Sequence, residues 1–124
     1  MSDSPLSGLR VLVVEDEALV AMLLEDMLGD LGCEVTALAS RVAQAVEIVR
    51  DPAQVFDVAI LDVNVAGETI APVAQALTER PAPFVFATGY GESGVPAAFR
   101  GRPTLQKPFG MADVERRLQE ATGR

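Results

Sequence analysis

The stretch Leu9-Arg10-Val11-Leu12-Val13-Val14-Glu15-Asp16, residues 9–16, decides the fold class. Its first six residues are almost continuously apolar and rich in β-branched valine, which is typical of a parallel strand buried on both faces. The run ends abruptly at two carboxylates, Glu15 and Asp16. In open parallel sheets, ligands bind beyond the carboxyl ends of the strands. The stretch therefore predicts the first strand of a buried sheet with polar side chains at its functional end.

Helical and strand patterns alternate after this first strand. A helix face is indicated by apolar residues at helical spacing, and Gly32 supplies a natural stop; the stripe is Val20, Leu23, Leu24, Met27, Leu28 and Leu31. Later apolar runs predict strands at 35–39, 58–61, 84–87 and 104–106.

Helices are expected between these strands. Ser40 is a candidate cap for a helix over 42–49, which Pro52 closes. Two more helices are expected, one through 73–77 and one over 111–121. Glycines and prolines gather between Gly89 and Pro103, so the fourth helix of the series is expected to be weak. This alternation predicts an α/β fold, a doubly wound five-stranded parallel sheet with helices on both faces.

Length, charge and composition exclude several classes of function. The chain has 124 residues, room for one domain, and its net charge of −8 argues against a nucleic-acid partner. The absence of histidine excludes a Ser-His-Asp nucleophile and a His-ligated zinc. The single Cys33 excludes an internal disulfide and fits a reducing compartment or, less commonly, a secreted protein without disulfides. No membrane-length apolar run or secretory signal is present, so we expect a soluble, cytoplasmic protein without membrane insertion.

Polar residues follow directly after four of the predicted strands. They are Glu15, Asp16, Asp62, Thr88 and Lys107. Each has an ordinary structural interpretation: the first two suit a helix N-terminus, Asp62 a turn, Thr88 a turn before glycine and Lys107 a solvated strand end. Because the carboxyl ends of parallel strands share one edge of the sheet, the whole set favours a single site.

Four motifs contain these strand-end residues: Val13-Val14-Glu15-Asp16-Glu17, Ile60-Leu61-Asp62-Val63-Asn64, Thr88 and Lys107-Pro108-Phe109. Together they resemble the response-regulator receiver domain, and the resemblance extends from Leu9 to Ala121. The resemblance implies a flavodoxin-like strand order 2-1-3-4-5. We expect residues 1–8 to be a flexible tail and 9–124 to be a receiver domain without an effector domain. Residues 83–90, Pro83-Phe84-Val85-Phe86-Ala87-Thr88-Gly89-Tyr90, are further similar to the signature of the "FAT GUY" subgroup of single-domain receivers, known from alphaproteobacterial two-component systems.

Residue chemistry and resemblance agree on what the site does. Three adjacent carboxylates repel one another unless a proton or cation is added, and Mg²⁺ suits a few carboxylates plus a phosphoryl group. Asp62 is the candidate nucleophile for an aspartyl-phosphate, with the metal and Lys107 neutralising the transferred charge. The resemblance implies that Glu15 and Asp16 hold Mg²⁺, that Asn64 adds its backbone carbonyl and that the Thr88 hydroxyl follows the phosphoryl group.

The implied partners are proteins. A histidine kinase would be the phosphodonor, and the output would be a downstream protein partner, a phosphotransfer protein or a phosphate sink. Two positions depart from the common receiver pattern: Glu15 replaces the usual first aspartate, and Thr104 stands where most receivers carry a switching aromatic residue. We expect Tyr90 to replace that aromatic residue and to move with Thr88.

Two other functions remain open from the sequence. A pseudo-receiver would only bind proteins and would neither bind Mg²⁺ nor take up phosphate. A haloacid-dehalogenase-like phosphatase is suggested by Asp62-Val63-Asn64-Val65, but that motif follows the first strand and has a second aspartate where Asn64 stands. A dinucleotide-binding Rossmann domain is set aside because no G-x-G-x-x-G follows the first strand.

Overall fold

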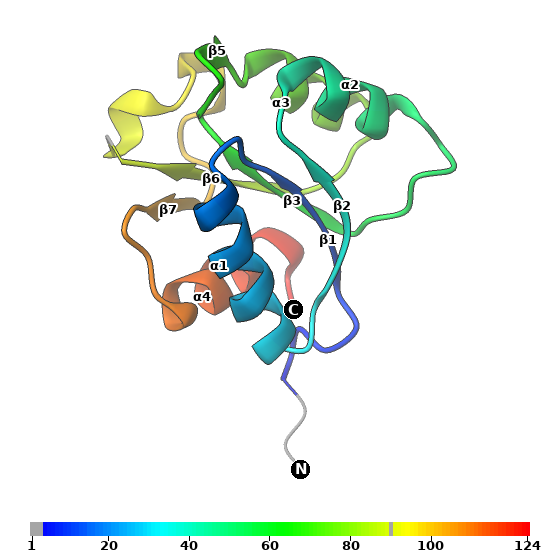
Figure 1. Cartoon of the computed structure of the whole chain (residues 1–124), viewed down its shortest axis with the longest axis vertical. Coiled ribbons are helices and arrows are strands. Elements are labelled where there is room, and N and C mark those ends of the chain that lie inside the picture. Colours follow the sequence, from blue (N-terminus) through cyan, green and yellow to red (C-terminus); the bar gives the residue numbers. More distant parts are fainter. Residues whose placement is uncertain (1–3, 90) are drawn as a thin grey trace.

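The computed structural model describes residues 4–89 and 91–124, which form a parallel sheet covered by helices on both faces (Figure 1). The strands of this sheet are β1 (Arg10–Val14), β2 (Glu34–Ala39), β3 (Val58–Asp62), β6 (Phe84–Thr88) and β7 (Thr104–Gln106). Their spatial order is β2-β1-β3-β6-β7, with every pair parallel. This order is the predicted 2-1-3-4-5, because β4 (Asn64–Val65) and β5 (Glu68–Thr69) form a separate antiparallel pair. The predicted fold class is confirmed.

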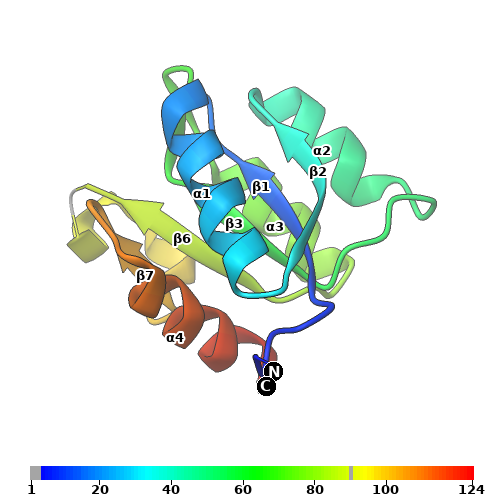
Figure 2. The same ribbon diagram turned by 60° about the horizontal axis from the view of Figure 1, so that its bottom comes forward.

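Four α-helices of the described residues cover the sheet. They are α1 (Ala18–Asp30), α2 (Val42–Arg50), α3 (Ala71–Glu79) and α4 (Met111–Thr122). Helices α1 and α4 lie on one face and α2 and α3 on the other (Figure 1), while β2 and β7 form the two opposite edges (Figure 2).

The pleat of the strands divides the core into two layers. Alternate residues of one strand point to opposite faces, so Leu12 and Val14 pack toward α2 and α3, whereas Val11 and Val13 pack toward α1 and α4. The central strands β3 and β6 are buried along their whole length. This rigid sheet holds its carboxyl-end residues in fixed positions.

The predicted buried face of helix α1 is confirmed at Leu24, Leu28 and Leu31 and is wrong at Leu23. Its buried residues are Ala21, Leu24 and Leu28, whereas Leu23 is 57% exposed. The helix also carries exposed Leu19 and Met22, so apolar residues nearly surround it. Apolar periodicity therefore located the helix, but it placed Leu23 in the core, where the structure has Ala21.

The weak fourth helix is confirmed as two short 3₁₀ segments. They span Gly91–Gly94 and Ala97–Phe99. Val95 between them is buried, and Phe99 packs its ring edge-on against Phe84 with centroids 6.0 Å apart. Tyr90, the expected switch residue, lies outside the described residues.

Two smaller expectations are corrected. The prediction of a flexible tail over 1–8 is wrong for its described part, because residues 5–8 form turns and Leu6 is fully buried in the core under α1 and α4. Ser40 does not cap α2: the N-cap residue is Arg41, and the Ser40 amide instead donates to Oε1 of Gln44 at 3.1 Å.

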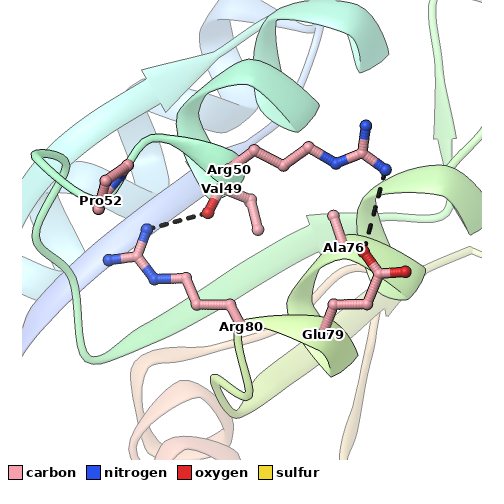
Figure 3. Close-up of a pocket in the computed structure, with 6 residues that line it drawn as sticks. All are labelled: Val49, Arg50, Pro52, Ala76, Glu79 and Arg80. Carbon is pink, nitrogen blue, oxygen red and sulfur yellow. Dashed lines mark hydrogen bonds and ion pairs between the residues drawn. The ribbon is translucent and has the colours of Figure 1, made fainter.

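A pocket of about 470 Å³ lies between α2 and α3, and the contacts of Arg80 inside it support the fold (Figure 3). Arg80 reaches across it, and its Nη1 donates to the Val49 carbonyl at 3.1 Å and the Asp51 carbonyl at 3.4 Å. Its Nη2 donates to the Gln54 carbonyl, and its guanidinium stacks 4.2 Å from the centroid of the Phe56 ring. Arg80 thus satisfies carbonyls at the end of α2, which a helix cannot satisfy itself.

Replacing Arg80 with alanine is expected to lower the free energy of unfolding by about 2 kcal/mol, because several carbonyl partners and the ring contact are lost. The matched control is Arg50→Ala in the same pocket. Arg50 is exposed and lies 4.0 Å from the exposed Glu79 carboxylate, so its loss should cost less than about 0.5 kcal/mol. Urea unfolding monitored by circular dichroism measures both. Equal losses in the two variants would contradict the capping role.

Candidate functional site

The polar residues predicted from the strand ends meet at one edge of the sheet. Glu15 directly follows β1 and is 3% exposed, and Asp62 ends β3 and is 7% exposed. Asp16 is exposed beside them. One carboxylate oxygen from each of the three lies within 4.8 Å of the others. The structure therefore assembles the predicted acidic cluster from segments nearly fifty residues apart.

Lys107, the chain's single lysine, connects the two buried carboxylates. Its Nζ lies 3.2 Å from Oε1 of Glu15 and 3.5 Å from Oδ1 of Asp62. Lys107 follows β7, and its backbone amide donates to the Thr88 carbonyl at 2.8 Å. The backbone of β6 thus fixes the Lys107 main chain, and the acidic cluster fixes its ammonium group.

The buried charges alter the protonation of the cluster. Burial raises the pKa of Glu15 to about 7; the nearby Asp62 charge adds to this, whereas the Glu17 amide and Lys107 oppose it. Burial alone would lower the pKa of Lys107, but the charges of Asp62 and Glu15 outweigh it and raise that pKa. Lys107 therefore stays charged at neutral pH, and the cluster holds excess negative charge that a cation would relieve.

Asp16 and Asn64 both accept hydrogen bonds from the turn of the hairpin that follows β3. Oδ2 of Asp16 accepts the Ala66 amide at 2.9 Å, and Oδ1 of Asn64 accepts the Gly67 amide at 3.1 Å. A pocket of about 410 Å³ opens beside them; its lining residues are Asp16, Glu17, Asp62, Val63, Asn64, Gly89 and Lys107. The lining thus includes the carboxylates of Asp16 and Asp62 and the ammonium group of Lys107.

Of the two predicted switch positions, Thr88 and Tyr90, the described residues include only Thr88. Thr88 is fully buried at the end of β6, and its neighbour Ala87 pairs with Asp62 in the sheet, so it lies next to the cluster. Thr104, at the start of the edge strand β7, donates its hydroxyl to the Arg102 carbonyl at 3.0 Å.

Sequence reasoning missed two backbone donors. The Glu17 amide donates to Oε2 of Glu15 at 3.1 Å, and the Ala66 amide holds Asp16. Every non-proline residue has such an amide, so no residue pattern could have marked these two.

The donor set fits a hard divalent cation. Three carboxylates within reach of one point, without histidine or thiolate, match the oxygen ligands that Mg²⁺ prefers. Glu15 supplies a carboxylate on a longer side chain than aspartate would, and this carboxylate still belongs to the cluster.

Comparison with known proteins identifies the class. The response regulator receiver domain family matches residues 11–119, and the chain belongs to this family. It is similar to SdrG from Sphingomonas melonis Fr1, with 46% identity, coverage of 95% of this chain and 96% of that chain, and a TM-score of 0.78. The receiver domain of the sensor histidine kinase PA1611 from Pseudomonas aeruginosa PAO1, solved with magnesium in its active-site cleft, is 26% identical over 95% of this chain and all of that chain, with a TM-score of 0.77.

A curated relative is longer than this chain. The transcriptional regulatory protein PdtaR of Mycobacterium tuberculosis is 31% identical over 121 residues, which cover 93% of this chain and 57% of that protein. The family is a signalling domain of two-component systems. Across the described ranges, no helix has both the length and the apolar character needed to cross a membrane.

Proposed function

We propose that this receiver domain accepts a phosphoryl group on Asp62 in a reaction that requires Mg²⁺. The observation that supports this most directly is the position of Asp62: it is nearly buried at the end of β3, 3.5 Å from Lys107 and within the acidic cluster. A carboxylate in this position can attack phosphorus, and the surrounding cations offset the charge that accumulates on the phosphoryl oxygens.

Each residue of the site has a separate role in the proposal. Glu15, Asp16 and Asp62 hold Mg²⁺ through carboxylate oxygens, and Asn64 adds its backbone carbonyl. Lys107 moves from bridging two carboxylates to binding a phosphoryl oxygen, as its reach to Asp62 supports. The Thr88 hydroxyl follows the phosphoryl group.

The donor in this proposal is a histidine kinase, because the chain contains no histidine that could carry the phosphoryl group itself. The output is a changed contact with a downstream protein or a phosphotransfer protein, or the withdrawal of phosphoryl groups from the kinase. We also assign the chain to the FAT GUY subgroup, on residues 83–90. Tyr90 would then move with Thr88.

The test is intact-mass spectrometry after incubation with acetyl phosphate, with Mg²⁺ or with excess chelator. One phosphoryl group should be added in Mg²⁺ and none in chelator, and peptide mapping should locate it at Asp62. Equal uptake in chelator would refute the metal requirement. No uptake together with no Mg²⁺ binding would favour the pseudo-receiver, and sustained hydrolysis of a phosphate ester would favour the phosphatase.

A further inference from the structure

The hairpin that follows Asp62 has an unusual turn. Ala66 and Gly67 connect β4 to β5, and both have positive φ, +52° and +80°. A two-residue hairpin turn with positive φ at both positions normally carries Asn, Asp or Gly at the first position. Ala66 is the one non-glycine residue with positive φ in the part of the chain that the structure describes. The turn therefore holds an alanine in a conformation that its side chain disfavours.

A contact from the acidic cluster holds this turn in place. The Ala66 amide donates to Oδ2 of Asp16 at 2.9 Å, across fifty residues of sequence. At the base of the hairpin the Ile70 amide donates to the Val63 carbonyl at 3.3 Å. Hydrogen bonds thus connect the tip of the hairpin to Asp16, in the loop after β1, and close its base at Val63, the residue after Asp62.

Asp16 is the member of the cluster that most needs such support. Glu15 and Asp62 are buried and contact Lys107, whereas Asp16 is exposed. An exposed carboxylate loses rotamer freedom when it binds a cation, and a group that already holds it reduces that cost. A carboxylate has about four acceptor positions, so Asp16 can accept the Ala66 amide and still face a cation.

We propose that the Ala66 amide is a positioning group for the divalent cation: it holds Asp16 in its binding orientation, and cation binding in turn stabilises the hairpin 64–69. This inference rests on the proposed function, since it concerns the same metal site. The two effects are necessarily reciprocal, because coupling between two equilibria has one free energy. Asp16 keeps the role of ligand, and Ala66 acts only through it.

The test is a series at position 66, Ala66→Gly and Ala66→Val, with Mg²⁺ affinity measured by isothermal titration calorimetry. β-Branched valine is forced away from positive φ, so its amide no longer points to Asp16. We expect Ala66→Val to weaken Mg²⁺ binding about fivefold, equivalent to one hydrogen bond of about 1 kcal/mol. Ala66→Gly relieves the turn and should bind at least as tightly as the wild type. Ala43→Val on α2 makes the same side-chain change at another exposed site and should leave the affinity unchanged.

A second readout does not depend on affinity. In the wild-type protein, amide hydrogen exchange of Ala66 and Gly67 measured by NMR should slow when Mg²⁺ is added. Unchanged exchange at saturating Mg²⁺ would overturn the inference, as would equal affinities for wild type and a folded Ala66→Val. If Ala66→Val does not fold, weaker binding by Ala66→Gly than by wild type would overturn it. Failure of the wild type to bind Mg²⁺ at all would instead refute the proposed function.

Discussion

Asparagine at position 62 is expected to abolish phosphoryl uptake and, in the absence of Mg²⁺, to make the protein more stable at about pH 8. A carboxamide does not attack phosphorus under conditions where a carboxylate does, so uptake should be lost completely. The gain in stability has a separate cause. The Asp62 charge helps to raise the pKa of Glu15, so its removal relieves repulsion inside the buried cluster.

The expected net gain is less than about 1 kcal/mol, because Asp62→Asn also removes the partner of Lys107 at 3.5 Å. Intact mass after incubation with acetyl phosphate measures uptake, and urea unfolding with chelator measures stability. Persistent Mg²⁺-dependent uptake in Asp62→Asn would refute the assignment of the phosphoacceptor. A loss of stability would contradict the argument from charge repulsion but not the assignment of Asp62 as the phosphoacceptor.

Asp57→Asn is the matched control, since Asp57 precedes the strand that Asp62 ends. Its carboxylate accepts hydrogen bonds from Arg10 and lies 3.0 Å from the Arg10 guanidinium, and these bonds lower the pKa of Asp57. A lowered pKa stabilises the fold above the ordinary pKa, and this stability is lost as the pH falls through the lowered value. Asp57→Asn should therefore lose up to about 1 kcal/mol at neutral pH and still take up phosphate.

The central strands β3 and β6 were predictable because their burial is complete. Every residue of β3 is buried, so a continuous apolar run that ends at Asp62 has one structural interpretation. Helix α1 was harder, because apolar residues occur on nearly all of its faces and Leu23 and Ala21 compete for the core. The hairpin 64–69 was not expected, since Ala66 lacks the turn chemistry that normally marks such a loop.

The side chains of the site were predictable, and their environment was not. Polar residues directly after buried strands must meet at one edge of a parallel sheet, which is why Glu15, Asp62 and Lys107 were found from order alone. The pKa of Glu15 depends on its burial and on the Glu17 amide, both of which require the folded chain.

Alanine in place of Lys107 is expected to have the largest effect on stability. It leaves Glu15 and Asp62 buried without the ammonium group, and the Lys107 side chain that carries this group is only 22% exposed. Removing one partner of a buried ion pair costs about 3 kcal/mol, because the remaining charge is uncompensated. With chelator present, the loss should be larger at about pH 8 than at about pH 6, because more of Glu15 is ionised at the higher pH.

The loss in the free energy of unfolding of Lys107→Ala should shrink as the pH falls, and the direction of this change follows from the pKa of Glu15. Its folded-state pKa of about 7 lies above its ordinary value of 4.5, so its burial costs stability at high pH, and protonation removes that cost as the pH falls from about 7 toward 4.5. Without Lys107, which lowers this pKa, protonation should occur at higher pH and the relief should begin earlier. Urea unfolding at about pH 6 and about pH 8 tests this directly.

Mg²⁺ should restore the stability of Lys107→Ala, because a cation bound to the folded state replaces the missing positive charge. Its affinity should be unchanged or higher, since a competing charge is gone. The conformational response to phosphorylation should weaken, because no ammonium group follows the phosphoryl oxygens. Arg116→Ala, which removes an exposed charge paired with Asp113, should change stability by less than about 0.5 kcal/mol. Loss of Mg²⁺ binding in Lys107→Ala, or equal destabilisation at both pH values, would contradict the role of Lys107 as the counter-charge of the acidic cluster.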